Sequence, residues 1–284
     1  MGIKGITEAS IEAGGRTWFY REALPEQDNG RPPVVLLHGL VSQSYGWRKT
    51  LPELAAAGFR AIAPDWLGCG FSQKVDRLDF SYRPEALAAA LGEWIEAMGI
   101  DRFSLVTQGF LGTAGLLYAL GARDRVERLV ILNGPVTPDA KLPWKMSQLA
   151  IPFVGDMLTQ DPLLVDRILE GGSPYQVADE DLDVYRRPFL KSSDAGRSLL
   201  AIVQRLAVPK VTQTVAAGFA SWEGPVLVLW GDRDPWTPVA QAEAFTKTLP
   251  QGELVILEEV GHYPQEDWPE KVNEALILFL RRQN

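Results

Sequence analysis

The sequence of 284 residues has few of the groups that several large protein classes require. Its single cysteine, Cys69, excludes an internal disulfide and favours a reducing compartment. Its two histidines, His38 and His262, are far apart and leave no ligand cluster for a metal ion. Gly68 and Gly70 lack the third glycine of a nucleotide-binding loop and do not open a helix. We therefore expect neither a metal nor a cofactor.

Positive charge and long apolar runs are also scarce. The 28 basic residues are outnumbered by 36 acidic ones, and the net charge of −8 argues against binding to nucleic acid. No apolar run approaches the roughly 18 residues that a membrane span needs. Residues 1–16 contain no apolar stretch of the kind found in secretory signals. These absences predict a cytoplasmic protein without a membrane span.

What the chain does contain is an alternation of short apolar runs and amphipathic segments. Residues 84–98 illustrate the helices, because a proline opens the segment, apolar side chains share one face and Gly99 follows it. Another helix is predicted near residues 47–57, where Gly58 follows as a good C-cap. Strand–helix alternation of this kind indicates an α/β fold with a mostly parallel sheet. Eight strands are predicted, at residues 6–13, 16–21, 33–37, 60–63, 103–106, 129–132, 226–230 and 254–257.

One long segment breaks the alternation. Residues 136–222 show helical patterns but no convincing strand, and seven prolines divide them into short pieces. The segment lies between the sixth and seventh predicted strands. We therefore predict a core domain made of residues 1–135 and 223–284, with a helical cap at 136–222.

Five short motifs occur in a characteristic order, namely HG at 38–39, DWLGCGFS at 65–72, LVTQGFLG at 105–112, GDRD at 231–234 and GH at 261–262. With these motifs the chain resembles the α/β-hydrolase fold superfamily over nearly its whole length. The YRRPF sequence at 185–189 is similar to the caps of epoxide hydrolases and haloalkane dehalogenases. The resemblance implies a small apolar substrate bound under the cap.

The resemblance also assigns roles to individual residues. His262 falls where the family has its general base, and imidazole is well suited to accept a proton near neutral pH. Asp234 falls at the position of the acid that orients this base, and we prefer it to Asp232. The backbone N–H groups of Leu40 and Phe110 correspond to the oxyanion hole.

Two further positions are assigned no catalytic role. The side chain of His38 is expected to be structural, because the family rarely uses it in catalysis. Asn133 occupies the acid position of some relatives, but an amide cannot serve as that acid.

The nucleophile position departs from the family pattern. Gly109 stands at the sharp strand-to-helix turn that presents a catalytic serine in G-x-S-x-G enzymes. The usual small flanking residues are replaced by Thr107 and Leu111, and we expect Leu111 to loosen or shift the turn. Thr113 falls a turn into the helix, so no change of register supplies a nucleophile. A catalytic Cys69 is a weaker alternative, and the loop serines have no evident reason to contact His262; they are Ser42, Ser44 and Ser72.

Two classes of function remain. The first is a hydrolase or lyase in which a His–Asp dyad activates water or removes a proton from the substrate directly. The second is a ligand-binding or scaffold protein that has lost its nucleophile. Retention of both His262 and Asp234 favours the enzyme, whereas Gly109 favours the binding protein, and we prefer the enzyme. Gln108 is a candidate to orient a ligand or water, although in the family the residue before the nucleophile usually points away from the cavity.

Overall fold

The computed structural model describes residues 3–27 and 29–282, so the predicted domain limits at 1 and 284 fall outside the described residues. Eight strands form one sheet in the order β1-β2-β4-β3-β5-β6-β7-β8. Only the pairs β1–β2 and β2–β4 are antiparallel. The strands are β1 (Thr7–Ala13), β2 (Arg16–Ala23), β3 (Val34–Leu37), β4 (Ala61–Pro64), β5 (Phe103–Gln108), β6 (Val126–Leu132), β7 (Val226–Gly231) and β8 (Gly252–Leu257).

The predicted strands and the mostly parallel sheet are confirmed. Central strands β3, β4, β5 and β7 are buried along their whole length, because helices cover both faces of the sheet and only apolar runs fit between them. The helix predicted near residues 47–57 is shorter than expected. Residues Ser44–Trp47 form a 3₁₀ turn, and α1 (Leu51–Ala56) starts only where Pro52 occupies its first turn.

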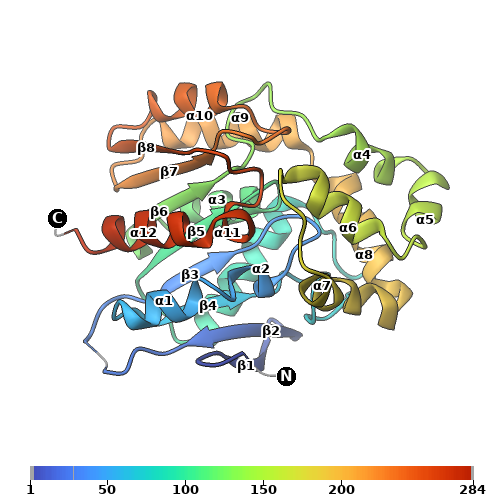
Figure 1. Cartoon of the computed structure of the whole chain (residues 1–284), viewed down its shortest axis with the longest axis horizontal. Helices are drawn as coiled ribbons and strands as arrows, with labels where there is room; N and C mark the ends of the chain where they lie inside the picture. Colours follow the sequence, from blue (N-terminus) through green and yellow to red (C-terminus); the bar gives the residue numbers. More distant parts are fainter. Residues whose placement is uncertain (1–2, 28, 283–284) are drawn as a thin grey trace.

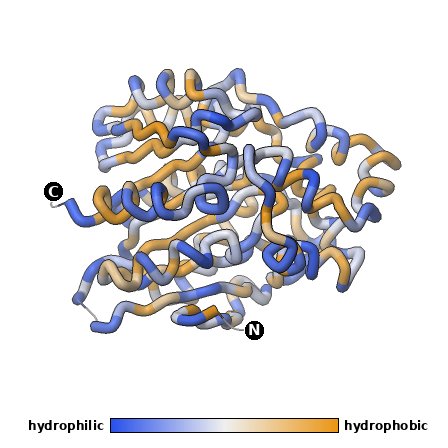
Figure 2. The backbone as a smooth tube through the Cα atoms, viewed as in Figure 1, coloured by the Kyte–Doolittle hydropathy of each residue, from blue (hydrophilic) through white to orange (hydrophobic). Residues whose placement is uncertain are grey.

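Two layers of helix enclose the sheet (Figure 1). Helices α1 and α12 (Pro269–Leu280) contribute to the apolar cluster on one face. The cluster on the other face takes side chains from α2 (Pro84–Ala97), α3 (Gly112–Gly121) and α10 (Val239–Thr246). The sheet runs orange through the middle of Figure 2, as expected of strands buried on both faces. A short helix, α11 (Pro264–Asp267), precedes α12.

Between β6 and β7 the chain forms helices joined by loops, with no strand in residues 136–222. We call α4 to α9 the inserted helices, and Figure 1 shows most of them gathered beyond one end of the strands. Apolar side chains of these helices share one cluster with Leu40 and Phe110. The inserted helices are α4 (Trp144–Ser147), α5 (Val154–Leu158), α6 (Leu164–Leu169), α7 (Asp179–Lys191), α8 (Ser193–Arg205) and α9 (Val208–Phe219).

Candidate active site

The sheet order brings four distant segments together. Strands β3, β5, β6 and β7 are consecutive neighbours and run parallel, so their carboxyl ends meet at one edge of the sheet. Leu40 follows β3, Gly109 follows β5, Asn133 follows β6 and Asp234 follows β7. The predicted site residues are therefore adjacent because of the topology, although they are up to about 200 residues apart in the chain.

His262 and Asp234 form a buried pair. The Nδ1 atom of His262 lies 2.8 Å from Oδ2 of Asp234, and both side chains are almost fully buried. Among the described residues no hydrogen-bond partner is found for Nε2 of the imidazole, which lies 3.2 Å from the Cβ position at Gly109. The rival Asp232 instead accepts a hydrogen bond of 3.4 Å from the Val260 N–H.

Asp234 is held by an unusually complete set of donors. Its Oδ1 accepts from the N–H groups of Trp236 (2.8 Å) and Thr237 (3.1 Å), and its Oδ2 also accepts from the Thr237 hydroxyl. Burial alone would raise the pKa of Asp234, but the charge of His262 and the donated hydrogen bonds outweigh burial and lower it. The carboxylate therefore stays ionised beside the imidazole.

Asn133 is a site residue whose role the sequence did not reveal. Its Nδ2 donates to Asp234 Oδ2 at 2.8 Å, and its Oδ1 accepts from the Gly231 N–H at 2.9 Å. The Asn133 side chain thus links the end of β6 to Asp234 and to the end of β7 by hydrogen bonds. Its backbone φ of +36° is rare outside glycine but is tolerated best by asparagine and aspartate. In the sequence, an asparagine placed directly after a buried strand was the only signal of this role.

Gly109 occupies the nucleophile position in geometry as well as in sequence. Its φ is +67°, and a Cβ added there would lie 3.2 Å from Nε2 of His262. A side chain at 109 would therefore point at the base. The expectation that Leu111 would loosen or shift the turn is wrong. The turn is closed by a bond of 3.1 Å from the Gly112 N–H to the Gly109 carbonyl, and the bulk of Thr107 fits because Gly115 has no side chain.

The backbone N–H groups of Leu40 and Phe110 are unpaired. Both residues are buried, yet within the described part of the chain neither N–H donates to a protein atom. A buried donor without an acceptor costs about 1–3 kcal/mol, and such groups are rare in folded proteins. Two of them beside one histidine are suited to receive a negatively charged oxygen.

The side chains considered as alternative nucleophiles are either un-ionised or engaged in other hydrogen bonds. Burial raises the pKa of Cys69 to about 12, so its thiol is not ionised near neutral pH. The Ser72 hydroxyl donates to the Asp65 carbonyl at 2.6 Å, and Ser44 accepts from the Arg21 guanidinium at 2.7 Å. Thr113 donates to the Phe110 carbonyl at 2.7 Å within its own helix.

His38 has both ring nitrogens engaged. Its Nδ1 lies 2.8 Å from the Gly39 carbonyl, and its Nε2 accepts from the Trp66 N–H at 3.1 Å. Burial lowers the pKa of His38, which favours the neutral ring that this pairing needs. The geometry therefore matches the structural role expected for this side chain.

Gln108 acts on the base rather than on a ligand. Its fully buried side chain donates from Nε2 to the His262 carbonyl at 2.7 Å. It also lies against Gly39, where an added Cβ would come within 2.3 Å of the Gln108 Oε1. This side chain links the turn at Gly109 to the His262 loop and to the segment that carries Leu40. Sequence reasoning missed this role because the contact spans 154 residues.

Aromatic rings and the inserted helices close the site. The rings of Trp236, Tyr263 and Phe110 lie 4.7, 5.1 and 5.5 Å from the His262 ring, measured between centroids. From the inserted segment, the Gly172 carbonyl accepts a hydrogen bond of 2.6 Å from the His262 N–H. Apart from its contact with Asp234, the His262 ring is therefore packed among aromatic rings and is almost fully buried.

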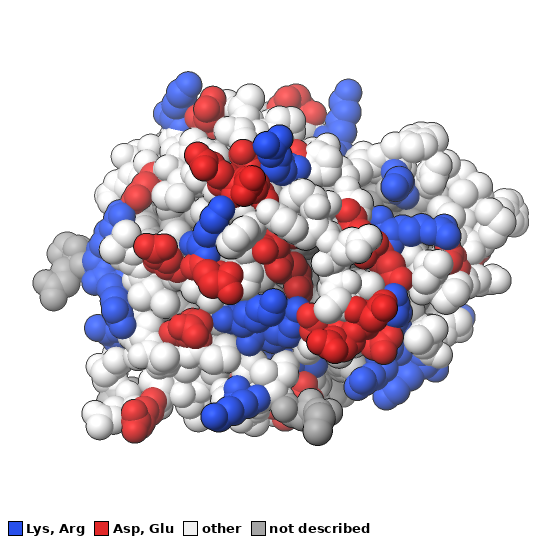
Figure 3. Space-filling model, viewed as in Figure 1, with Lys and Arg blue, Asp and Glu red and all other residues white. Residues whose placement is uncertain are grey.

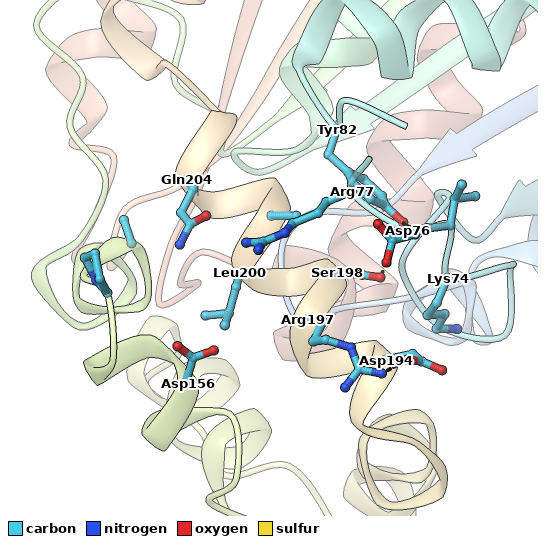
Figure 4. Close-up of a pocket in the computed structure, with 14 residues that line it drawn as sticks. Lys74, Asp76, Arg77, Tyr82, Asp156, Asp194, Arg197, Ser198, Leu200 and Gln204 are labelled. Carbon is cyan, nitrogen blue, oxygen red and sulfur yellow. Dashed lines mark hydrogen bonds and ion pairs between the residues drawn. The ribbon is translucent and has the colours of Figure 1, made fainter. Parts of the chain in front are cut away.

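A cavity of about 730 Å³ lies elsewhere on the molecule (Figure 4). It is bounded by α8, by residues just before and within α5, and by the loop at 74–82, and none of the candidate site residues lines it. Figure 4 shows charged side chains of both signs around it, including Arg77, Arg197, Asp156 and Asp194. Among the described residues, no group of three or more His, Cys, Asp or Glu side chains is arranged to hold a metal ion.

Asp267, close to the base, is expected to make the stability of the fold depend on pH. Its carboxylate accepts bonds of 2.6 Å from the Ser173 hydroxyl and from the Gly261 N–H. Burial raises its pKa from 3.8 to about 6, against the lowering effect of these two bonds. The pKa of Asp267 is therefore higher in the folded than in the unfolded protein, so the protonated side chain favours the folded state. This contribution to stability is complete below pH 3.8 and is lost as the pH rises through about 6.

We expect Asp267→Asn to remove this dependence. Between about pH 5 and about pH 8, the free energy of unfolding should fall by about 1–2 kcal/mol more in the wild type than in the variant. Urea denaturation at both pH values measures the difference, and any loss of a hydrogen bond cancels because it is the same at both. Equal falls in the two proteins would contradict the assignment.

Comparison with known proteins agrees with the fold. Residues 32–269 match the family model described as the alpha/beta hydrolase fold. The chain is 30% identical to a haloalkane dehalogenase from Mycobacterium marinum, over 87% of this chain and 84% of that protein. It is 28% identical to a haloalkane dehalogenase from Sphingobium indicum, over 99% and 98% of the two chains.

Comparison with solved structures also identifies haloalkane dehalogenases as similar proteins. The crystal structure of a loop variant of a haloalkane dehalogenase from Bradyrhizobium elkanii superimposes with a TM-score of 0.86, at 26% identity and over 97% of both chains. The match therefore extends through the inserted helices as well as the sheet. The chain belongs to the α/β hydrolase fold family, in its haloalkane dehalogenase-like branch.

Proposed function

We propose that the protein is a hydrolase or lyase that acts on a small apolar molecule without a side-chain nucleophile. In this proposal His262 is the base, Asp234 orients it, and the N–H groups of Leu40 and Phe110 form the oxyanion hole. Residues 136–222 act as a cap over a core domain of residues 1–135 and 223–284. The relatives named haloalkane dehalogenases support a small apolar substrate.

One observation carries the proposal. The position that a Cβ at Gly109 would occupy lies 3.2 Å from His262 Nε2 and 3.2 Å from the Gly39 Cα, and the residues that follow Gly39 and Gly109 carry the two unpaired, buried N–H groups. A protein that only binds an apolar ligand gains nothing from an ion pair and two unsatisfied donors, each of which opposes folding. In catalysis the ion pair would orient the base, and the two unpaired N–H groups would bind the negatively charged oxygen.

The proposed chemistry places a water molecule or an acidic substrate group beside Nε2. His262 takes its proton, Asp234 stabilises the imidazolium, and the N–H groups of Leu40 and Phe110 bind the alkoxide or enolate that forms. An acyl-enzyme or alkyl-enzyme route is not part of the proposal, because each needs a nucleophilic side chain. The proposal therefore departs in mechanism from enzymes of this fold that form such intermediates.

The second candidate is a ligand-binding or scaffold protein. The observation in its favour is Gly109 itself, since the turn is otherwise well formed and would present any side chain to the base. In that case the His262–Asp234 pair serves only to hold the segments together.

A screen of small apolar esters, lactones, epoxides and β-diketones separates the two candidates. We expect an activity that survives a serine-directed fluorophosphonate, with no covalent label detected by mass spectrometry. The same activity should fall at least about 100-fold in His262→Ala, because that change removes the base. Stoichiometric labelling lost on mutation of one serine or threonine would reveal a nucleophile and defeat the proposal. An activity unaffected by His262→Ala would defeat it equally.

A further inference from the structure

Arg48 is a buried cation of the core that contacts two carboxylates from distant parts of the chain. Its Nη1 atom lies 2.6 Å from Oε1 of Glu266, and its Nη2 atom lies 2.5 Å from Oδ2 of Asp181. Glu266 belongs to α11, which begins two residues after His262, whereas Asp181 belongs to α7 of the inserted helices. One guanidinium can serve both acids because its donors form a fixed, planar fork.

Two tyrosines complete this network of charges. The buried Tyr185 of α7 donates its hydroxyl to Oε1 of Glu266. Tyr45 donates to Oδ1 of Asp181 at 2.7 Å, and its ring centroid lies 4.5 Å from the guanidinium carbon of Arg48. The cation and both carboxylates are therefore paired, as charges taken out of water must be.

The segment that contains Arg48 also carries the candidate oxyanion donor. Leu40 stands eight residues before Arg48, and its carbonyl accepts a hydrogen bond of 3.1 Å from the hydroxyl of Tyr263, the residue after the base. Between them, the Gln43 side chain donates to the Val184 carbonyl of α7 at 2.8 Å. The oxyanion segment, the base segment and α7 therefore meet at one place.

The contact with Arg48 differs from the other charged contact between the inserted helices and the core. Among the described residues, the ion pairs across this boundary are Arg48–Asp181 and Lys210–Glu85. The second has its atoms 3.4 Å apart and both side chains more than half exposed, so it contributes little. The Arg48 side chain is only 7% exposed. In Figure 3, acidic side chains gather at the position that α7 has in Figure 1, with basic side chains beside them.

We propose that Arg48 is a positioning residue of the candidate active site. Through Glu266 it holds the base segment against the segment that carries Leu40, and through Asp181 it holds α7 over both. His262 stays enclosed as a result. The inference rests on the proposed function in taking His262 as the base, but the position of that side chain can be measured without turnover.

Chemical labelling of histidine tests the proposal. Diethyl pyrocarbonate acylates accessible, unprotonated imidazole, and the chain has only two histidines, so mass spectrometry of peptides measures each rate separately. His262 is 1% exposed and should react slowly in the wild type. In Arg48→Met its labelling should be at least about tenfold faster, because Glu266 and Asp181 lose the cation that joins them.

His38 is an internal reference for general unfolding. It is fully buried with both ring nitrogens engaged, so it reacts only when the whole fold loosens. A positioning role predicts faster labelling of His262 alone, whereas a general loss of stability predicts faster labelling of both histidines. Arg48→Lys restores the charge without the fork and should label at an intermediate rate. It also serves as the test variant if Arg48→Met does not fold.

The matched control is Arg186→Met in α7. Arg186 also pairs with several acids, but all of them belong to the inserted helices, namely Asp166, Asp179 and Asp183. Its loss should leave the labelling of His262 at the wild-type rate. The proposal would be overturned by equal increases at His38 and His262, by wild-type labelling in both Arg48 variants, or by an equal increase in Arg186→Met. Failure to find any substrate would count against the proposed function and would leave these rates unchanged.

Discussion

Gly109→Ser is expected to acquire esterase activity on a small activated ester such as p-nitrophenyl acetate. The added Cβ would lie 3.2 Å from Nε2 of His262, so a serine hydroxyl can be placed within reach of the base. The unpaired N–H groups of Leu40 and Phe110 would receive the oxyanion. Because nucleophile and base act as a unit, His262→Ala in the same background should remove about 1,000-fold or more of the gained rate.

Strain from the new side chain must be separated from catalysis. Gly109 has a φ of +67°, and its added Cβ would also lie 3.2 Å from the Gly39 Cα, so we expect a cost of about 1–3 kcal/mol in stability. Gly99→Ser is the matched control, because its φ of +64° is similar but it faces open space. It should lose stability without gaining activity. A folded Gly109→Ser protein that releases no p-nitrophenol would favour the binding-protein alternative.

Asp234→Ala is expected to be the most destabilising single change at the site. It would leave His262, Asn133 and the donors of residues 236 and 237 without their shared acceptor in a buried region. Removing one partner of such a buried pair costs about 3–5 kcal/mol. Chemical denaturation measures the loss, and Asp232→Ala, a neighbouring acid outside the pair, should cost much less.

Asp234→Asn separates the structural from the electrostatic role of this acid. The amide has a similar shape, so much of the stability should be kept, but its NH₂ group cannot accept the Nδ1 proton of His262. In the Gly109→Ser background the esterase rate should fall by about 1,000- to 10,000-fold, since the imidazole is held in the wrong tautomer. A full rate in that double variant would show that Asp234 does not orient the base.

The fold could be predicted because its signals are local. Short apolar runs, prolines at helix starts and glycines at helix ends identify strands and helices within windows of about 10–15 residues. Residues 84–97 show this well, since Pro84 opens the helix and Gly99 follows it with a positive φ. The length of α1 was misjudged because a 3₁₀ turn and an α-helix share the same apolar spacing over one turn.

The candidate site was predicted less completely because its contacts are long-range. His262 and Asp234 stood at recognisable positions after strands, and the structure brings their side chains to 2.8 Å. Asn133 and Gln108 act through partners 101 and 154 residues away, and no periodicity encodes such pairs. The shape of the turn at Gly109 depended on space left by Gly115, which lies further along the chain in α3.

The hydrogen bond from the His262 N–H to the Gly172 carbonyl makes this amide a natural reporter of site opening. His262 is 1% exposed, and a movement of residues 136–222 away from it would break this bond and expose the amide to solvent. Deuterium exchange at this one position would therefore give the free energy of opening under native conditions. Under the proposed function, the rate of this opening would set a ceiling on turnover, however fast the proton transfer itself is.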